Sequence, residues 1–218
     1  MTSNPPSARL RRSAGFFEPG GEAALVCAVT EVESTSCAEV VVAVRKQSGS
    51  YLHAATLSGA ISAFVVLAFQ LFSASPFAVV WMLADPVLAF LLGAWGASRS
   101  DVVRRLFTPR NERLRRVETY ARAAFVERGI AATSKRSGVL VYISLLEREA
   151  SVVPDDGVRA AVPDAEWRVA AGAVESAARQ GRSSDVAAAI VAMKSVLSCA
   201  LPRSADDVNE LPDEVTSE

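Results

Sequence analysis

The sequence contains a single histidine, His53, and three cysteines, Cys27, Cys37 and Cys199. His53 lies at the start of a long apolar block, at an expected membrane interface, and this position argues against Ser-His-Asp and Cys-His nucleophile systems and against zinc sites built on histidine. The cysteines are odd in number and show no CxxC spacing. We therefore expect reduced thiols in a cytosolic compartment.

The sequence also lacks phosphate-binding glycine motifs, a secretory signal and a strong net charge. Neither GxxxxGK[ST] nor GxGxxG occurs, so nucleotide binding through those motifs has no support. Residues 1–15 are polar, and no apolar signal-peptide core follows their arginines. The net charge is −1, which gives no reason to expect a nucleic-acid partner.

What the sequence does have is one long apolar block, residues 52–98, in which Asp85 is the only charged residue. A single membrane-spanning helix needs about 20 residues, and the block is roughly twice as long. The segment Ser-Ala-Ser-Pro at 73–76 supplies a turn near its middle. We therefore predict a hairpin of two transmembrane helices, at 52–73 and 76–97.

Arginines that follow the second predicted helix set the expected orientation. The turn between the helices carries no charge, whereas Arg45 and Lys46 precede the hairpin and an arginine-rich segment follows it. The positive-inside rule then places both flanks in the cytoplasm. The same arginines fit anionic lipid headgroups, and they also fit the solvated face of an amphipathic helix. The residues that we call the basic collar are Arg99, Arg104, Arg105, Arg110 and Arg113.

The flanks of the hairpin are typical of two parts of one small layered α/β domain. Residues 16–50 contain a helical pattern and a β-branched run at 40–44, which indicates a buried strand. Residues 99–202 contain a helix at 111–128, strands at 139–143 and 149–153, and two closing helices. The short link between those two strands predicts antiparallel pairing. Residues 1–15 are expected to be disordered, and 203–218 form an acidic tail.

Several short segments carry a family resemblance in their order along the chain. They are EVESTSCAEVVVAV at 31–44, Ala121 with Phe125, RSGVLVYIS at 136–144, Glu147-Arg148, Asp156-Gly157-Val158, Trp167, and NELPD at 209–213. Together they resemble the TPM-domain family, which includes thylakoid-lumen proteins linked to photosystem repair and a modulator of acetylcholine receptors. The chain is similar to a bacterial subgroup of predicted membrane proteins. The resemblance implies a small layered mixed-sheet TPM-like domain, interrupted by the hairpin, in the bacterial inner (plasma) membrane.

Carboxylates are the remaining candidates for chemistry. Glu39 begins the first predicted strand, and Asp155 and Asp156 follow the third. If they converge at one end of the sheet, their oxygens suit Ca²⁺ or Mg²⁺. The resemblance implies divalent-metal binding and weak acid phosphatase activity. The alternative is that Asp155-Asp156-Gly157 is an ordinary turn and that Glu39 is a strand-edge charge.

Asp85 lies near the middle of the second predicted transmembrane helix and is followed by Pro86. A charge at mid-bilayer costs on the order of 3 kcal/mol on insertion scales. One interpretation is a polar contact, either across the hairpin with Gln70 or with a second copy or a client helix. The other is a shallow hairpin in which Asp85 and Pro86 mark a kink near water.

These observations predict a two-pass membrane protein whose soluble domain faces the cytoplasm. We expect it to act as an accessory or adaptor factor in membrane-protein assembly, quality control or repair. Its expected partners are the bilayer with its anionic headgroups and another membrane protein or a second copy, with no nucleic acid. The alternative is a divalent-metal-dependent phosphatase of low activity that uses Glu39, Asp155 and Asp156.

Overall fold

The computed structural model describes residues 20–74, 77–133, 135–204 and 216–217. The predicted disordered segment 1–15, part of the predicted turn at 73–76 and most of the acidic tail lie outside these residues. The chain divides into two compact units, which are described separately. The sheet unit comprises Met1–Ser48 and Leu114–Glu218, and the hairpin unit comprises Gly49–Arg113.

The sheet unit contains a mixed sheet in the order β3-β2-β1-β4. The strands are β1 (Glu39–Arg45), β2 (Gly138–Ser144), β3 (Glu149–Pro154) and β4 (Thr216–Ser217). β1 and β2 are parallel, from the pair Glu39 and Gly138 to the pair Arg45 and Ser144. β2 and β3 are antiparallel, as the short link between them predicted. No sequence pattern predicted β4, a two-residue strand in the acidic tail that runs parallel to β1.

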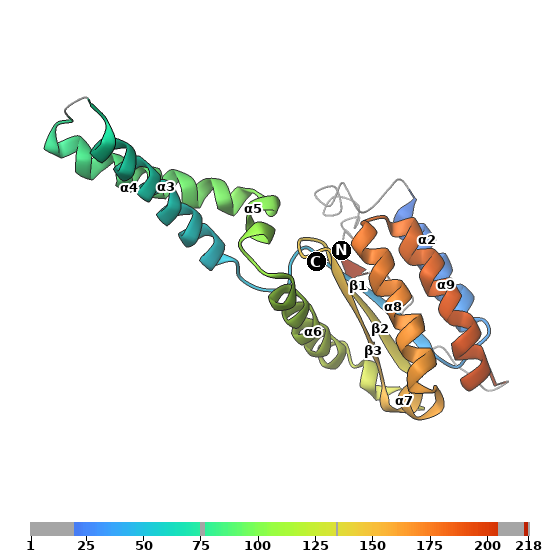
Figure 1. The fold of residues 1–218 in the computed structure, drawn as a ribbon. Helices are drawn as coiled ribbons and strands as arrows, with labels where there is room; N and C mark the ends of the chain where they lie inside the picture. Colours follow the sequence, from blue (N-terminus) through green and yellow to red (C-terminus); the bar gives the residue numbers. More distant parts are fainter. Residues whose placement is uncertain (1–19, 75–76, 134, 205–215, 218) are drawn as a thin grey trace, which may run out of the picture. The chain divides into compact units, whose positions relative to one another are not determined.

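Helices cover both faces of this sheet (Figure 1). On one face, Val40, Val42 and Val44 pack with α2 (Gly21–Glu33), α8 (Asp164–Gln180) and α9 (Ser183–Ala200). On the other, Val41 and Ala43 pack with α6 (Arg110–Glu127) and the 3-10 helix η1 (Ile130–Ala132). Burial on both faces explains why the strands are continuous apolar runs rather than alternating ones.

One local detail differs from the sequence-based expectation. In one interpretation Asp155-Asp156-Gly157 is an ordinary turn, but a short helix, α7 (Asp156–Ala161), begins there. The Asp155 side chain caps this helix by accepting a hydrogen bond from the Asp156 N–H. α8 begins at Asp164, directly after Pro163.

The hairpin unit consists of α3 (Leu52–Phe72), α4 (Val79–Arg99) and α5 (Asp101–Leu106). α3 and α4 lie side by side along their length (Figure 1). α3 begins at the predicted residue 52, and the other three boundaries differ by one to three residues from the predicted 52–73 and 76–97. Glycine allows the close approach, because a Cβ on Gly59 would lie 2.7 Å from the Phe90 carbonyl oxygen.

In the described part of the chain, three helices are long and apolar enough to cross a membrane: α3, α4 and α9. In α9 a third of the apolar window is buried, against 11% in α3 and none in α4. Val186, Ile190, Met193 and Leu197 of α9 belong to the core beneath the sheet. Length and composition therefore single out three helices, of which α9 alone contributes a substantial face to that core.

Candidate functional site

The three predicted metal ligands lie at the same end of the sheet. Glu39 is the first residue of β1 and pairs with Gly138, the first residue of β2. The Asp155 N–H donates to the Gly138 carbonyl oxygen at 2.9 Å. Glu39 and Asp155, both buried, thus flank Gly138 on neighbouring strands, whereas Asp156 is 68% exposed.

Arg136 is the cation that this end of the sheet already contains, and the sequence analysis did not select it. Its Nη2 donates to Asp155 Oδ1 at 3.0 Å and lies 3.0 Å from Asp156 Oδ2. The hydrogen bond to Asp155, and then the charges of both aspartates, raise the pKa of Arg136 above its usual value. The Arg136 guanidinium therefore balances both aspartates from the side that faces solvent.

The loop that carries Arg136 is fixed to the start of α7 by backbone contacts. The Gly157 N–H donates to the Arg136 carbonyl oxygen at 3.0 Å. A Cβ on Gly157 would lie 2.6 Å from that same oxygen, so only glycine allows the approach. Arg136 itself has a positive φ of 51°. The position of the guanidinium thus depends on tertiary contacts that no local sequence pattern reveals.

These residues fit a divalent cation poorly as they are arranged. The backbones of Glu39 and Asp155 lie on either side of Gly138, two strand spacings of about 4.8 Å apart. The space above Gly138 is taken by Ile130, whose carbonyl oxygen would lie 2.8 Å from an added Cβ. Among the described residues, no three His, Cys, Asp or Glu side chains form a group that could hold a metal ion. One feature favours a cation: Asp155 Oδ2 is buried and has no hydrogen-bond partner among those residues.

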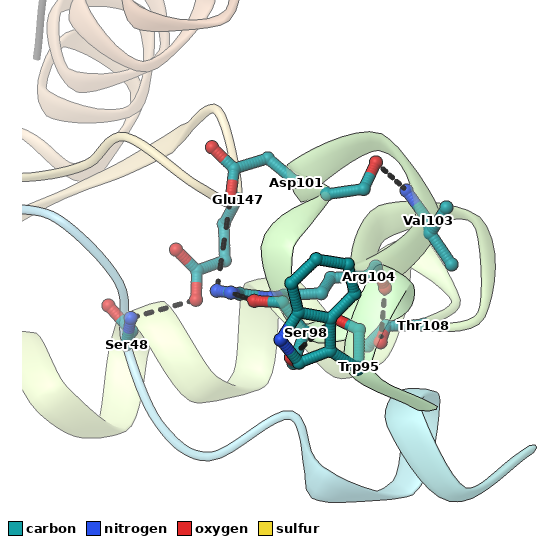
Figure 2. A network of polar contacts seen from close by, with 9 residues as sticks. Ser48, Trp95, Ser98, Asp101, Val103, Arg104, Thr108 and Glu147 are labelled. Carbon is teal, nitrogen blue, oxygen red and sulfur yellow. Dashed lines mark hydrogen bonds and ion pairs between the residues drawn. The ribbon is translucent and has the colours of Figure 1, made fainter. Parts of the chain in front are cut away.

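A buried polar cluster lies at the opposite end of β1 and β2. Glu147 accepts hydrogen bonds from the Ser48 N–H at 2.8 Å and from the Ser144 hydroxyl. Figure 2 shows Ser48 and Glu147 facing each other. The Ser48 hydroxyl lies 3.0 Å from that of Tyr142 and donates to Ser144 Oγ at 2.8 Å.

Burial raises the pKa of Tyr142, and its hydrogen bond with Ser48 opposes the shift. The sequence analysis used Glu147 only as part of the resemblance. Its one local signal was a charged residue in the short link between two apolar strands. The cluster holds the chain after β1 and the turn after β2 together, because Ser48 belongs to the first and Glu147 to the second.

In the hairpin unit, the structure brings Asp85 and Gln70 together. Gln70 is buried, and its Nε2 donates to Asp85 Oδ2 at 2.9 Å and to the Trp81 carbonyl oxygen at 3.2 Å. Gln70 Oε1 is buried without a hydrogen-bond partner in the described part of the chain. The two polar side chains are thus joined across the hairpin, although Pro86 lies inside α4.

The basic collar runs from the end of α4 through α5 to the first turn of α6. Arg99 lies over the Trp95 ring, 5.0 Å from its centroid. Arg104 donates to the Ser98 carbonyl oxygen, and its Nη1 lies 3.8 Å from Asp101 (Figure 2). Arg105 ends α5 with Leu106, and Arg110 and Arg113 begin α6.

Comparisons with known proteins extend this description. A family model described as the TPM domain matches residues 99–196. No curated protein matches the chain. Among solved structures, the chain is similar to the NMR structure of BA42 protein from the psychrophilic bacterium Bizionia argentinensis, with a TM-score of 0.57 and 17% identity. That similarity covers 93% of this chain and 96% of the other, and at this identity it shows the fold alone. The resemblance seen in the sequence is confirmed over residues 99–196, which match the TPM domain.

Proposed function

We propose that the protein is a membrane-anchored TPM-domain protein in which α3 and α4 cross the bilayer and α9 does not. The supporting observation is burial. α3 and α4 are strongly apolar, yet almost none of their apolar windows is buried, whereas α9 contributes a face to the core of the sheet unit. Exposed apolar helices of about 30 Å match the hydrocarbon core of a bilayer. Outside a bilayer, this apolar surface would be exposed to water.

The orientation proposed for this hairpin places both flanks in the cytoplasm of a bacterium. The support is the basic collar, which follows α4, and the lack of charge in residues 73–78 between the helices. Arginine is enriched on the cytoplasmic side of short flanks. Reporter fusions after Ser48 and after residue 204 test this directly: both are expected to be active with a cytoplasmic reporter and inactive with a periplasmic one.

As a biochemical role, we propose an accessory or adaptor factor in membrane-protein assembly, quality control or repair. The hairpin presents a continuous apolar surface, and Asp85 is held against Gln70 within it. Polar side chains inside a membrane face a bundle interior or a protein partner. The partner is another membrane protein or a second copy of this chain, beside a bilayer with anionic headgroups.

Co-purification after crosslinking in mild detergent tests the adaptor role. The wild type is expected to retain the same membrane protein or a second copy in repeated preparations, and the variant Asp85→Leu is expected to lose it. Gly96→Ala on the same helix is a matched control, because nothing lies within 4 Å of an added Cβ there. Recovery of the wild type alone, at full yield in every preparation, would contradict the proposal.

A second candidate is a metal-dependent phosphatase of low activity at Glu39, Asp155 and Asp156. Two points favour it: the buried Asp155 Oδ2, and a family model named TPM phosphatase over residues 99–196. We rank the phosphatase second because a metal ion at this site would have to displace the Arg136 guanidinium from Asp155 and Asp156. Calorimetric titration with Ca²⁺ and Mg²⁺ tests it. Saturable binding that is lost in Asp155→Asn would support this site, and no binding at millimolar metal would remove it.

A further inference from the structure

The apolar side chains of the short helix α5 are not used by any function described above, and the sequence did not predict this helix. α4 ends at Arg99, and the extended backbone of Ser100 separates it from α5. The Ser100 hydroxyl caps α5 by accepting from the Val103 N–H at 3.4 Å. Because only one residue joins the two helices, α5 begins at the depth where the apolar run of α4 ends.

Two large aliphatic side chains of α5 are mostly exposed. Val102 is 65% exposed and Leu106 is 77% exposed. They are four residues apart and therefore share one side of the helix. Leu52, at the start of α3, is also exposed. Three such side chains at one end of the hairpin need an apolar environment.

Within the hairpin unit, α5 is also tied to the start of α3. His53 Nε2 lies 3.0 Å from the Thr108 hydroxyl, which donates to the Arg104 carbonyl oxygen at 2.9 Å. Thr108 is buried. The end of α5 is thereby held at the level of the first turn of α3, so the exposed aliphatic side chains keep a fixed depth.

The charge around α5 is positive. Residues 99–113 contain five arginines against Asp101 and Glu112, a net charge of +3. Trp95 is exposed and carries Arg99 over its ring. Tryptophan is enriched at the membrane–water interface, and each arginine near an anionic leaflet is attracted to it.

From this combination we propose that α5 is an interfacial segment that lies in the headgroup layer of an anionic leaflet. Val102 and Leu106 insert at the boundary between headgroups and acyl chains, and the net positive charge of residues 99–113 attracts the anionic headgroups. This inference rests on the proposed function, since it assumes that α3 and α4 cross the bilayer. It adds a lipid-dependent docking surface that sets the depth of the hairpin.

The test uses the full chain in nanodiscs with one fluorescent label at a time. Cys27, Cys37 and Cys199 are replaced by serine, and a single cysteine is introduced by Leu106→Cys. Two control positions are labelled in the same way: Leu88→Cys, in the middle of α4, and Val126→Cys, which is 73% exposed on α6. Nanodiscs contain either phosphatidylcholine alone or an equal mixture with phosphatidylglycerol, and quenching by iodide and by brominated lipid is measured.

In the anionic nanodiscs, iodide is expected to quench the label at 106 at least about threefold less than the label at 126, since an interfacial helix buries its apolar face about 5–10 Å deep. Brominated lipid is expected to quench it, and this quenching should decrease in phosphatidylcholine alone or at high salt. Equal iodide quenching of the labels at 106 and 126, with the label at 88 protected, would overturn the inference about α5 but not the membrane crossing. Iodide quenching at 88 would overturn the membrane crossing itself. If the label at 106 is protected from iodide in both kinds of nanodisc and is not quenched by brominated lipid, then protein rather than lipid covers α5. That result also overturns the inference.

Discussion

The hydrogen bond between Gln70 and Asp85 predicts an unequal response to two apolar substitutions. Gln70 donates to Asp85 at 2.9 Å and to the Trp81 carbonyl at 3.2 Å. Asp85→Leu removes one acceptor but leaves Gln70 the other. Gln70→Leu removes the one donor that the structure gives Asp85 among the described residues. We therefore expect Gln70→Leu to destabilise the hairpin more than Asp85→Leu.

The expected magnitudes follow from burial, because Gln70 is buried and Asp85 is half-buried. Leaving a buried polar group without its partner costs about 1–3 kcal/mol, which is our expectation for Gln70→Leu. Asp85→Leu loses a bond worth about 0.6 to 1.7 kcal/mol between membrane helices. It also removes a side chain that costs about 3 kcal/mol at mid-bilayer. By these figures Asp85→Leu is expected to be more stable than the wild type by about 1 to 2 kcal/mol, and the double variant at least as stable as Gln70→Leu.

A double-mutant cycle measures this directly. The free energy of unfolding is obtained by titrating SDS into the detergent-solubilised protein and following tryptophan fluorescence. A coupling of about 0.6 to 1.7 kcal/mol is expected between positions 70 and 85. Leu83→Ala, whose side chain is exposed on α4, serves as the control and should be additive with Gln70→Leu. Coupling of zero, or a larger loss for Asp85→Leu than for Gln70→Leu, would refute the reasoning.

Three further predictions concern packing, pH and domain independence. Gly93→Ala should destabilise the hairpin in the same SDS assay by about 1–3 kcal/mol through overlap with α3, whereas Gly96→Ala should be neutral or stabilising. Burial raises the pKa of Glu175, so the folded protein binds a proton at this site more tightly than the unfolded chain does. The free energy of unfolding should therefore fall as pH rises from the ordinary glutamate pKa through the raised one. Thermal unfolding should therefore show Glu175→Gln to be more stable than wild type at neutral pH, with the difference vanishing in acid. Replacing residues 50–108 with a Gly/Ser linker of about ten residues should leave a soluble protein with a cooperative melt by circular dichroism, and an aggregated product would contradict this.

The elements that could be predicted from the sequence are those whose signal is local. The β-branched residues of β1 and β2 form uninterrupted runs, and the link before β3 is too short for a crossover. Two long apolar segments separated by a short Pro-containing turn predict a helical hairpin. Gln70 and Asp85 could be paired because the two helices are of similar length and their polar residues are few.

The elements that could not be predicted depend on contacts between distant segments. α5 has six residues inside an arginine-rich run, too few to show a helical period. β4 has only two residues, and it forms by pairing with the edge of β1. The residues of the tail carry no strand pattern of their own. Arg136 reaches both aspartates only because the loop before β2 packs against the start of α7. A carboxylate cluster in a sequence therefore predicts a cation, but it does not distinguish a metal ion from an arginine.

The position of the hairpin in the chain is easier to understand from the sheet than from the membrane. Parallel β1 and β2 need a crossover of a dozen or more residues, and α6 with its flanking loops is long enough to supply it. The hairpin is therefore an insertion into a crossover that the sheet already requires. Where the chain leaves the sheet, the N–H groups of Leu145 and Leu146 donate to the carbonyls of Arg45 and Lys46, and the contacts of Ser48 follow directly. Because these bonds fix the chain up to the residue before the hairpin unit begins, changes within α3 and α4 should leave the sheet intact, and the two units can be perturbed independently.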